Sequence, residues 1–475
     1  MNRLAIIVLA LSLAACAVNP VTGDRQLALV SEAQEIQIGR EVAGSAEQQF
    51  GLVKDDELQA YIQRLGDQLA MASERPDLPW TFRVVDEPTP NAFAAPGGFI
   101  YFTRGLLVMM RNEAELVSVL GHEIGHVTAR HSVTMMSRAQ LAQLGIGIGS
   151  ILSPTVAQFG DLAAGGLQLL FLKYGRDAER QADDLGYRYA LEQGYDVREM
   201  VNVFAALQQS AELAGQTPVP NWQASHPYPA ERIQRINQQL ASLPPASPPR
   251  RIGEDEYLQR IDGLDYGENP REGFFDDNRF LHPDLAFRLD FPPGWRTQNL
   301  SRAVIAGSPQ EDAIIQMTVV PGSLKEAANK FFSQQGLTAG RVGSQQVNGL
   351  PAIAGNFEMQ TEQTKLGGTV TFVELAGRTY MILGYAPAQQ RAKYDKTFRA
   401  SMNSFARLTN AAALNKQPLQ LSIVRLPRAM SLEAFNSAYP SDIPLAELAL
   451  INHLRGPEDV MPANFRAKRV TEAGN

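Results

Sequence analysis

Two histidines and a glutamate stand in the pattern His122-Glu123-Ile124-Gly125-His126. On a helix, His122 and His126 lie one turn apart on the same face, so both imidazoles can reach one metal ion. Glu123 then lies beside that ion, where its carboxylate can take a proton from a water molecule. The pattern predicts a hydrolytic metal centre; the alternative is two structural histidines beside a surface carboxylate.

A helix is expected around this pattern. Asn112 is a suitable N-cap residue, and Glu115 follows three positions later, as in a capping box. Apolar residues continue one helical face beyond it at Leu116, Val119 and Leu120. This helix positions both histidines.

A catalytic zinc ion keeps three protein ligands and one open position, so a third ligand must come from elsewhere. Glu179 is the best candidate, because it lies near the start of a second predicted helix that runs towards Gly194. Asp183 follows one turn later on the same face, where it can orient a ligating imidazole. The alternative is that both carboxylates are solvated helix charges.

Two further histidines need separate treatment. His131 is nine residues from His122, about 900° of helix rotation, so it is predicted to lie on the opposite face and to be structural. His226 precedes a predicted helix that contains Arg232. His226 and Arg232 could stabilise an oxyanion, or His226 could occupy the open zinc position and keep the site latent.

Taken in order, these elements resemble the gluzincin metallopeptidase family of HtpX and the CAAX prenyl proteases, in its periplasmic BepA-like branch. The resemblance covers about residues 19–240. It implies a Zn²⁺ ion bound by His122, His126 and Glu179. It also implies that Glu123 is the general base and that Asp183 has a supporting catalytic role.

The segment 91–98 is similar to the same branch and implies substrate-binding roles for Asn91, Ala92, Gly97 and Gly98. In that branch the strand that follows, here Phe99-Ile100-Tyr101-Phe102, borders the cleft. An extended substrate can pair with it by strand addition.

The chain departs from the family in two respects. It shows neither the several membrane spans of HtpX nor the helical repeats of BepA, which leaves the partner contacts of BepA in doubt here. The segment 419–470 resembles a degenerate LysM module, which implies contact with peptidoglycan.

The N-terminus predicts export. Arg3 is followed by an apolar run to Ala15, too short to span a bilayer, and then by Cys16. The run Leu13-Ala14-Ala15-Cys16 resembles a bacterial lipoprotein box, which implies cleavage before Cys16 and acylation of its thiol. Because Ala17 follows, the resemblance implies tethering to the outer membrane, facing the periplasm. The alternative is a chance cysteine after an ordinary signal peptide.

The fold class predicted for these 475 residues is multidomain: a mainly α-helical metallopeptidase domain with a small β-sheet, then an α+β domain and a small C-terminal module. The boundaries are 1–15 for the signal peptide, 16–243 for the peptidase, 244–283 for a Pro-rich connector, 284–409 for the α+β domain and 417–473 for the module. The apolar stretch 141–172 is expected to form buried or lid helices; membrane contact is the alternative.

Composition narrows the function further. The formal net charge of −7 gives no basic excess, which argues against nucleic acid as a partner. The sequence predicts a zinc endopeptidase acting on unfolded or misassembled envelope proteins. The competing hypothesis is a non-proteolytic periplasmic chaperone or scaffold with a vestigial or latent zinc site. Glu123 favours the enzyme, because a purely structural zinc site needs no adjacent base.

Overall fold

A computed structural model describes residues 16–143, 173–213, 225–227, 229–246, 249–360 and 364–473. The predicted signal peptide and most of the apolar stretch 141–172 lie outside the described residues. Within the described ranges, no helix has both the length and the apolar character that a membrane crossing requires.

The chain forms two compact units. Unit 1 combines Met1–Gly267 with Leu419–Asn475, and unit 2 is Glu268–Pro418. Unit 2 is therefore an insertion within unit 1. The segment predicted as an α+β domain, 284–409, lies in unit 2, whereas 419–473 belongs to the same unit as the predicted peptidase.

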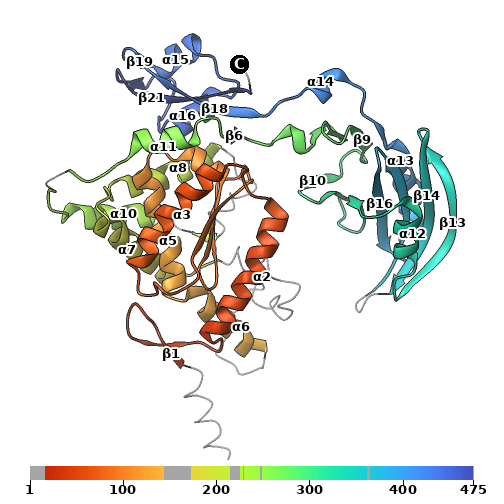
Figure 1. Ribbon diagram of the computed structural model, residues 1–475, viewed down its shortest axis with the longest axis horizontal. Helices are drawn as coiled ribbons and strands as arrows, with labels where there is room; N and C mark the ends of the chain where they lie inside the picture. Colours follow the sequence, from red (N-terminus) through yellow and green to blue (C-terminus); the bar gives the residue numbers. More distant parts are fainter. Residues whose placement is uncertain are drawn as a thin grey trace, which may run out of the picture. The chain divides into compact units, whose positions relative to one another are not determined.

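Unit 1 is mainly helical (Figure 1). It carries a three-stranded sheet in the order β3-β5-β4. Its strands are β3 Thr81–Val85, β4 Ala92–Ala95 and β5 Phe99–Thr103. β3 runs parallel to β5, and β4 runs antiparallel to it. The helices described up to residue 261 are α2 Glu32–Phe50, α3 Asp56–Met71, α4 Arg104–Met109, α5 Glu113–Thr128, α6 His131–Gln143, α7 Arg176–Glu192, α8 Glu199–Leu213, α10 Pro229–Ala241 and α11 Glu254–Ile261.

The C-terminal part of unit 1 adds a second sheet. Its order is β21-β18-β6, with β6 Asp265–Tyr266, β18 Leu419–Arg425 and β21 Arg466–Glu472. Between β18 and β21 lie α15 Leu432–Ala438 and α16 Leu445–Ile451, and a short β19–β20 pair, Met430–Ser431 with Val460–Met461. Leu419 pairs directly with Tyr266, so the two ends of the insertion lie side by side.

One hydrophobic core joins the peptidase segment to these C-terminal residues. Leu106 and Val203 share that core with Leu448. A buried lysine, Lys468 on β21, donates to the carbonyl oxygens of Val108, at 2.6 Å, and Met110. The C-terminal residues therefore complete the unit that carries the predicted site.

Unit 2 contains a seven-stranded antiparallel sheet in the order β10-β11-β12-β16-β15-β14-β13. Its strands are β10 Arg296–Leu300, β11 Ala303–Gly307, β12 Ile314–Val320, β13 Leu337–Val347, β14 Leu350–Gln360, β15 Lys365–Leu375 and β16 Arg378–Pro387. Two helices pack on it, α12 Leu324–Phe332 and α13 Arg391–Ser404 (Figure 1). A smaller sheet has the order β17-β9-β8-β7, with β7 Phe274–Asp276, β8 Arg279–His282, β9 Phe287–Asp290 and β17 Ala406–Arg407. The chain thus has a mainly helical unit and a β-rich unit, in agreement with the predicted multidomain class.

Candidate metal centre

Helix α5 carries the histidine–glutamate pattern, as predicted. Asn112 is its N-cap, and its side chain accepts a hydrogen bond from the backbone N–H of Glu115 at 2.9 Å. The return contact differs from a capping box, because the Glu115 carboxylate accepts from the N–H of Arg111, at 2.6 Å, rather than from that of Asn112. Every residue of α5 is buried, so the pattern lies in the core of unit 1.

Small residues bring α7 into close contact with α5. A Cβ atom on Gly186 would lie 2.8 Å from the backbone nitrogen of His122, and one on Gly121 would lie 2.9 Å from the Cα of Gly186. At Gly125 an added Cβ would lie 3.2 Å from the Cα of Ala182. The backbones therefore pack directly against each other, and α7 presents its carboxylates to the histidines of α5.

Four buried side chains form one cluster: His122, His126, Glu179 and His226. One candidate ligand atom from each lies within 4.8 Å of all the others. The Nε2 atoms of His122 and His126 are 3.0 Å apart, and Glu179 Oε1 is 3.4 Å from His126 Nε2. Residues more than 100 positions apart in the sequence thus meet at one point.

Asp183 and Arg232 surround the cluster on the side of His122. Asp183 Oδ1 is 2.9 Å from His122 Nδ1. Arg232 bonds Asp183 through two nitrogens, at 2.8 and 2.6 Å, and a third lies 3.0 Å from Glu179 Oε2. Its guanidinium also lies 4.3 Å from the ring centre of Phe204. Arg232 therefore holds two buried carboxylates, those of Asp183 and Glu179.

The buried charges shift each other's pKa values. Burial alone would raise the pKa of Glu179, but His226 and Arg232 outweigh it and hold that pKa well below its usual range. In the same way Arg232 and His122 overcome burial and lower the pKa of Asp183. Burial lowers the pKa of His126 well below its usual value. The site therefore favours ionised carboxylates and a neutral His126, the forms that bind a cation.

His226 lies within the cluster. Its Nδ1 is 3.1 Å from Glu179 Oε1 and 3.2 Å from His122 Nε2, and its Nε2 is 3.5 Å from Glu123 Oε1. Burial opposes protonation, but Glu179 and Glu123 outweigh it and raise the pKa of His226. This residue faces both the candidate ligands and the candidate base.

The donor set fits a zinc ion. Two imidazoles and a carboxylate are typical ligands of a catalytic zinc site. Two ring nitrogens only 3.0 Å apart, with a carboxylate beside them, need a shared cation or proton between them. The buried Oε1 of Glu123 has no hydrogen-bond partner among the described residues, although a buried polar atom normally has one.

The predicted position of His131, on the opposite face of the helix from His122, was wrong. Helix α5 ends at Thr128, and Arg130 has a φ of 58°, so the helical rotation used for the prediction does not extend to residue 131. The chain turns back and places His131 Nδ1 3.0 Å from His126 Nδ1. The other ring nitrogen of His131 lies 3.0 Å from Gln181 Oε1.

Tyr174 is a site residue for which the sequence suggested no role. Its ring stacks on that of His126, with centroids 4.0 Å apart, and its hydroxyl lies 2.9 Å from Ser132 Oγ. Burial, followed by the charges of Glu123 and Glu179, raises its pKa. Its only sequence signal was its place five residues before Glu179.

The model of Peptidase family M48 matches residues 56–240, which contain the whole cluster. These residues belong to peptidase family M48. The M48 domain is similar to several curated proteins. A "Beta-barrel assembly-enhancing protease" of Escherichia coli K12 is 29% identical over 258 residues, which are 51% of this chain and 50% of that protein. "Mitochondrial metalloendopeptidase OMA1" of Schizosaccharomyces pombe is 27% identical, over 38% and 52% of the two chains.

"Metalloprotease YcaL" of Escherichia coli K12 is 34% identical over 34% of this chain and 63% of that protein. The chain spans about half the length of the first two relatives, so the likeness concerns the M48 domain. Among solved structures, the cyanobacterial PsbP protein of Synechocystis gives a TM-score of 0.24 at 11% identity, over 27% of this chain and 91% of that one. No argument rests on that likeness.

In the M48 domain one edge of the small sheet belongs to β4, whose four residues are all buried. β5 is the central strand and is paired on both sides, which corrects the expectation that an extended substrate pairs with Phe99–Phe102. Asn91 and Thr103 exchange hydrogen bonds, so the backbone groups of Ala92 and Ala94 point away from β5. No hydrogen bond joins them to another described residue.

The predicted substrate-binding residues have different places. Ala92 lies on the β4 edge, and Asn91 immediately precedes it; both residues are buried. Gly97 and Gly98 form the turn between β4 and β5, with φ values of 79° and 107°. A Cβ on Gly97 would lie 2.7 Å from the Cα of Ile36, so this glycine permits close packing against α2.

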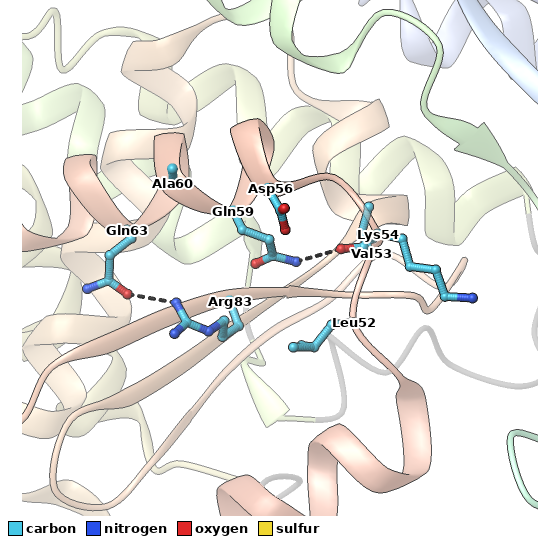
Figure 2. A pocket seen from close by; sticks show the side chains of 8 residues that line it. All are labelled: Leu52, Val53, Lys54, Asp56, Gln59, Ala60, Gln63 and Arg83. Atoms are coloured by element: carbon cyan, nitrogen blue, oxygen red, sulfur yellow. Dashed lines mark hydrogen bonds between the residues drawn. The ribbon is translucent and has the colours of Figure 1, made fainter.

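The opposite edge of the sheet, on β3, is covered by side chains and by the backbone of residues 52–53, where the N–H of Val53 bonds the carbonyl of Val84 at 3.0 Å. Figure 2 shows a pocket where Gln59 and Gln63 of α3 lie against β3. Gln59 bonds the backbone N–H and carbonyl of Val84 at 2.9 and 2.8 Å, and Gln63 accepts from the N–H of Phe82 at 3.0 Å. These contacts occupy the outer edge of β3, so β4 is the edge of this sheet whose outward backbone groups bond no other described residue.

Proposed function

We propose that this chain is a zinc metalloendopeptidase, with zinc held by His122, His126 and Glu179 and with Glu123 as the general base. The observation that carries the proposal is the buried cluster on α5 and α7 beside Glu123, whose Oε1 accepts no hydrogen bond from a described residue and lies 3.5 Å from His226 Nε2. A site that served only structure would leave no buried acceptor unused next to its ligands.

The reaction is addition of water across a peptide bond. Zinc, when bound, supplies a Lewis acid that polarises the carbonyl and acidifies water. Glu123 takes a proton from the attacking water while the oxygen of that water bonds to the carbonyl carbon. The carbon–nitrogen bond then breaks, and the proton passes to the leaving amine. Asp183 supports the reaction by accepting from His122 Nδ1, which keeps the Nε2 lone pair directed at the metal position.

We propose that substrates bind as an added strand along β4. The outward backbone groups of Ala92 and Ala94 bond no other described residue. Both residues are buried, so these groups can form main-chain hydrogen bonds with a substrate of any sequence once the segment that covers them moves. β4 also packs next to α5, which carries the base. An extended polypeptide, rather than a folded protein, fits such an edge.

We propose envelope proteins that are unfolded or misassembled as the substrates. The support is the name of two relatives, "Beta-barrel assembly-enhancing protease", and the export signal predicted from the N-terminus. The same signal supports a periplasmic location and a lipid anchor on Cys16 in the outer membrane. Contact of residues 419–470 with peptidoglycan remains a prediction from the LysM resemblance.

His226 determines whether the centre is open. Its Nδ1 lies within hydrogen-bond distance of both Glu179 and His122, which supports the proposal that it fills the fourth metal position and keeps the site latent. The competing role is stabilisation of the oxyanion once the ring has moved away. The two roles predict opposite effects of removing the imidazole.

The test uses the purified full chain, measured for bound zinc and for cleavage of a denatured protein. We expect Glu123→Gln to keep zinc and to lose at least about 100-fold in kcat. Glu212→Gln, which changes an exposed carboxylate on α8 outside the cluster, is the control and should cleave at the wild-type rate. Full cleavage by Glu123→Gln contradicts the mechanism. Faster cleavage by His226→Ala supports latency, slower cleavage supports the oxyanion role, and zinc without activity in every variant favours the scaffold.

A further inference from the structure

We propose that His131 and Gln181 are positioning residues that fix the tautomer of His126, so that its Nε2 lone pair faces the metal position. The inference rests on the proposed zinc site and extends it to residues outside the ligand set. It concerns the side of the cluster away from Asp183 and Arg232.

A turn in the chain makes the contact possible. α5 ends at Thr128, the N–H of Ala129 bonds the carbonyl of Gly125, and Arg130 adopts a left-handed conformation. His131 then begins α6, and its side chain returns to His126. His131 is only 8% exposed, so water does not compete freely for its ring nitrogens.

The direction of the hydrogen bonds follows from Gln181. Its Oε1 can only accept, so His131 Nε2 must carry the proton that lies in their 3.0 Å contact. A neutral imidazole with a proton on Nε2 has a lone pair on Nδ1. His126 Nδ1, 3.0 Å away, must therefore be the donor. The remaining nitrogen, His126 Nε2, is left with its lone pair towards His122 and Glu179.

Helix α7 thus directs both histidine ligands. Asp183 accepts from His122 Nδ1 directly, and Gln181, two residues earlier on the same helix, acts on His126 through His131. Ligating histidines almost always donate their second nitrogen to such an acceptor, and removing it typically weakens metal binding about 10–100-fold. This relay, from Gln181 through His131 to His126, gives His126 the same support without a second buried charge.

The orientation of the Gln181 amide is decisive. With its NH₂ group turned to His131, every donor in the relay would reverse, and His126 would carry a proton on Nε2. That proton would point into the cluster and exclude a cation. A residue that can only accept at position 181 should therefore preserve the site, and a residue without an acceptor should weaken it.

The experiment measures the dissociation constant of Zn²⁺ itself on the full chain, by competition with a chromogenic chelator, together with thermal unfolding of the zinc-free protein. Variants are His131→Ala, Gln181→Ala, their double mutant and Gln181→Glu. Gln193→Ala, the same change at the exposed end of α7, is the matched control. Cleavage of a short peptide is recorded separately.

We expect His131→Ala and Gln181→Ala each to weaken zinc binding about 10–100-fold. The double mutant should bind zinc no more weakly than His131→Ala, because Gln181 acts through His131. Gln181→Glu should stay within a few-fold of the wild type and of the control. Additive losses, an equal loss in Gln181→Glu, or lower unfolding temperatures at unchanged zinc affinity would each overturn the relay. If the variants change zinc affinity as expected but the wild type cleaves no peptide, the positioning role of His131 and Gln181 is supported and the proposed peptidase function is contradicted.

Discussion

The contact between α5 and α7 can be tested by adding one methyl group. In Gly186→Ala the new Cβ would lie 2.8 Å from the backbone nitrogen of His122, whereas ordinary contact begins at 3.4 Å, a deficit of about 0.6 Å. Neither atom belongs to a flexible side chain, so the helices must separate locally. Such overpacking typically costs about 1–3 kcal/mol.

A matched variant isolates that cost. Gly44 lies inside α2, and a Cβ there would meet nothing within 4 Å. Gly44→Ala and Gly186→Ala gain the same helix propensity, about 1 kcal/mol, so the difference between them is the clash alone. For a unit of this size 1 kcal/mol corresponds to about 2–4 °C in Tm, so Gly186→Ala should unfold about 2–12 °C below Gly44→Ala.

The assay is thermal unfolding of the zinc-free full chain, followed by zinc titration. Metal ligands must hold their distances within about 0.2 Å, so a displacement of α7 should also weaken zinc binding in Gly186→Ala and leave it unchanged in Gly44→Ala. If the two variants show the same Tm and the same zinc affinity, the close approach of the helices does not set the site geometry. The reasoning about α5 and α7 would then be wrong.

Three further predictions concern other parts of unit 1. Arg232→Met leaves buried carboxylates without their cation, so it should destabilise the zinc-free protein by about 3–5 kcal/mol in denaturant unfolding. Arg180→Met, at an exposed ion pair, is the control and should change the free energy of unfolding little. Burial, with Lys468 and Arg111, lowers the pKa of His453 to about 3, so stability should be lost as pH falls from about 6.5 towards that value. His453→Gln should reduce this acid sensitivity in unfolding experiments at a series of pH values, and an unchanged pH profile would refute it. Replacing 268–418 by a short Gly/Ser linker should leave zinc binding and peptide cleavage intact, because Tyr266 and Leu419 are paired neighbours, whereas ending the chain at Gly267 should abolish folding.

The sequence predicted the local features of the site and missed those that depend on distant contacts. The spacing of His122 and His126 specifies one helix face, and the N-cap expected at Asn112 is confirmed. His131 was misplaced because a single residue with positive φ, Arg130, ends the helical periodicity. No periodicity could indicate that Tyr174 stacks on His126, since their contact depends on how the segment before α7 returns to α5.

The same limit applies to the sheet and to the C-terminal residues. Segment 91–102 was recognised as a turn and a strand, but strand order depends on pairing, and pairing placed β4 at the edge. From the sequence alone, Lys468 would be expected to be an ordinary surface lysine on a strand of alternating polar and apolar residues. Its burial against Val108 and Met110 depends on the return of the chain to unit 1 after an insertion of 151 residues, 268–418.

That return has a consequence for the order in which the molecule is made. The bond between Lys468 and Val108 spans 360 residues, and that between Asn452 and Arg111 spans 341. A growing chain that has completed α5, α7 and α10 still lacks the strand that covers the end of α4, so its core cannot close. The residues from Leu419 onwards, which follow the insertion, complete that core. The metal cluster therefore gains its full packed surroundings only after the insertion and these later residues have been added to the chain.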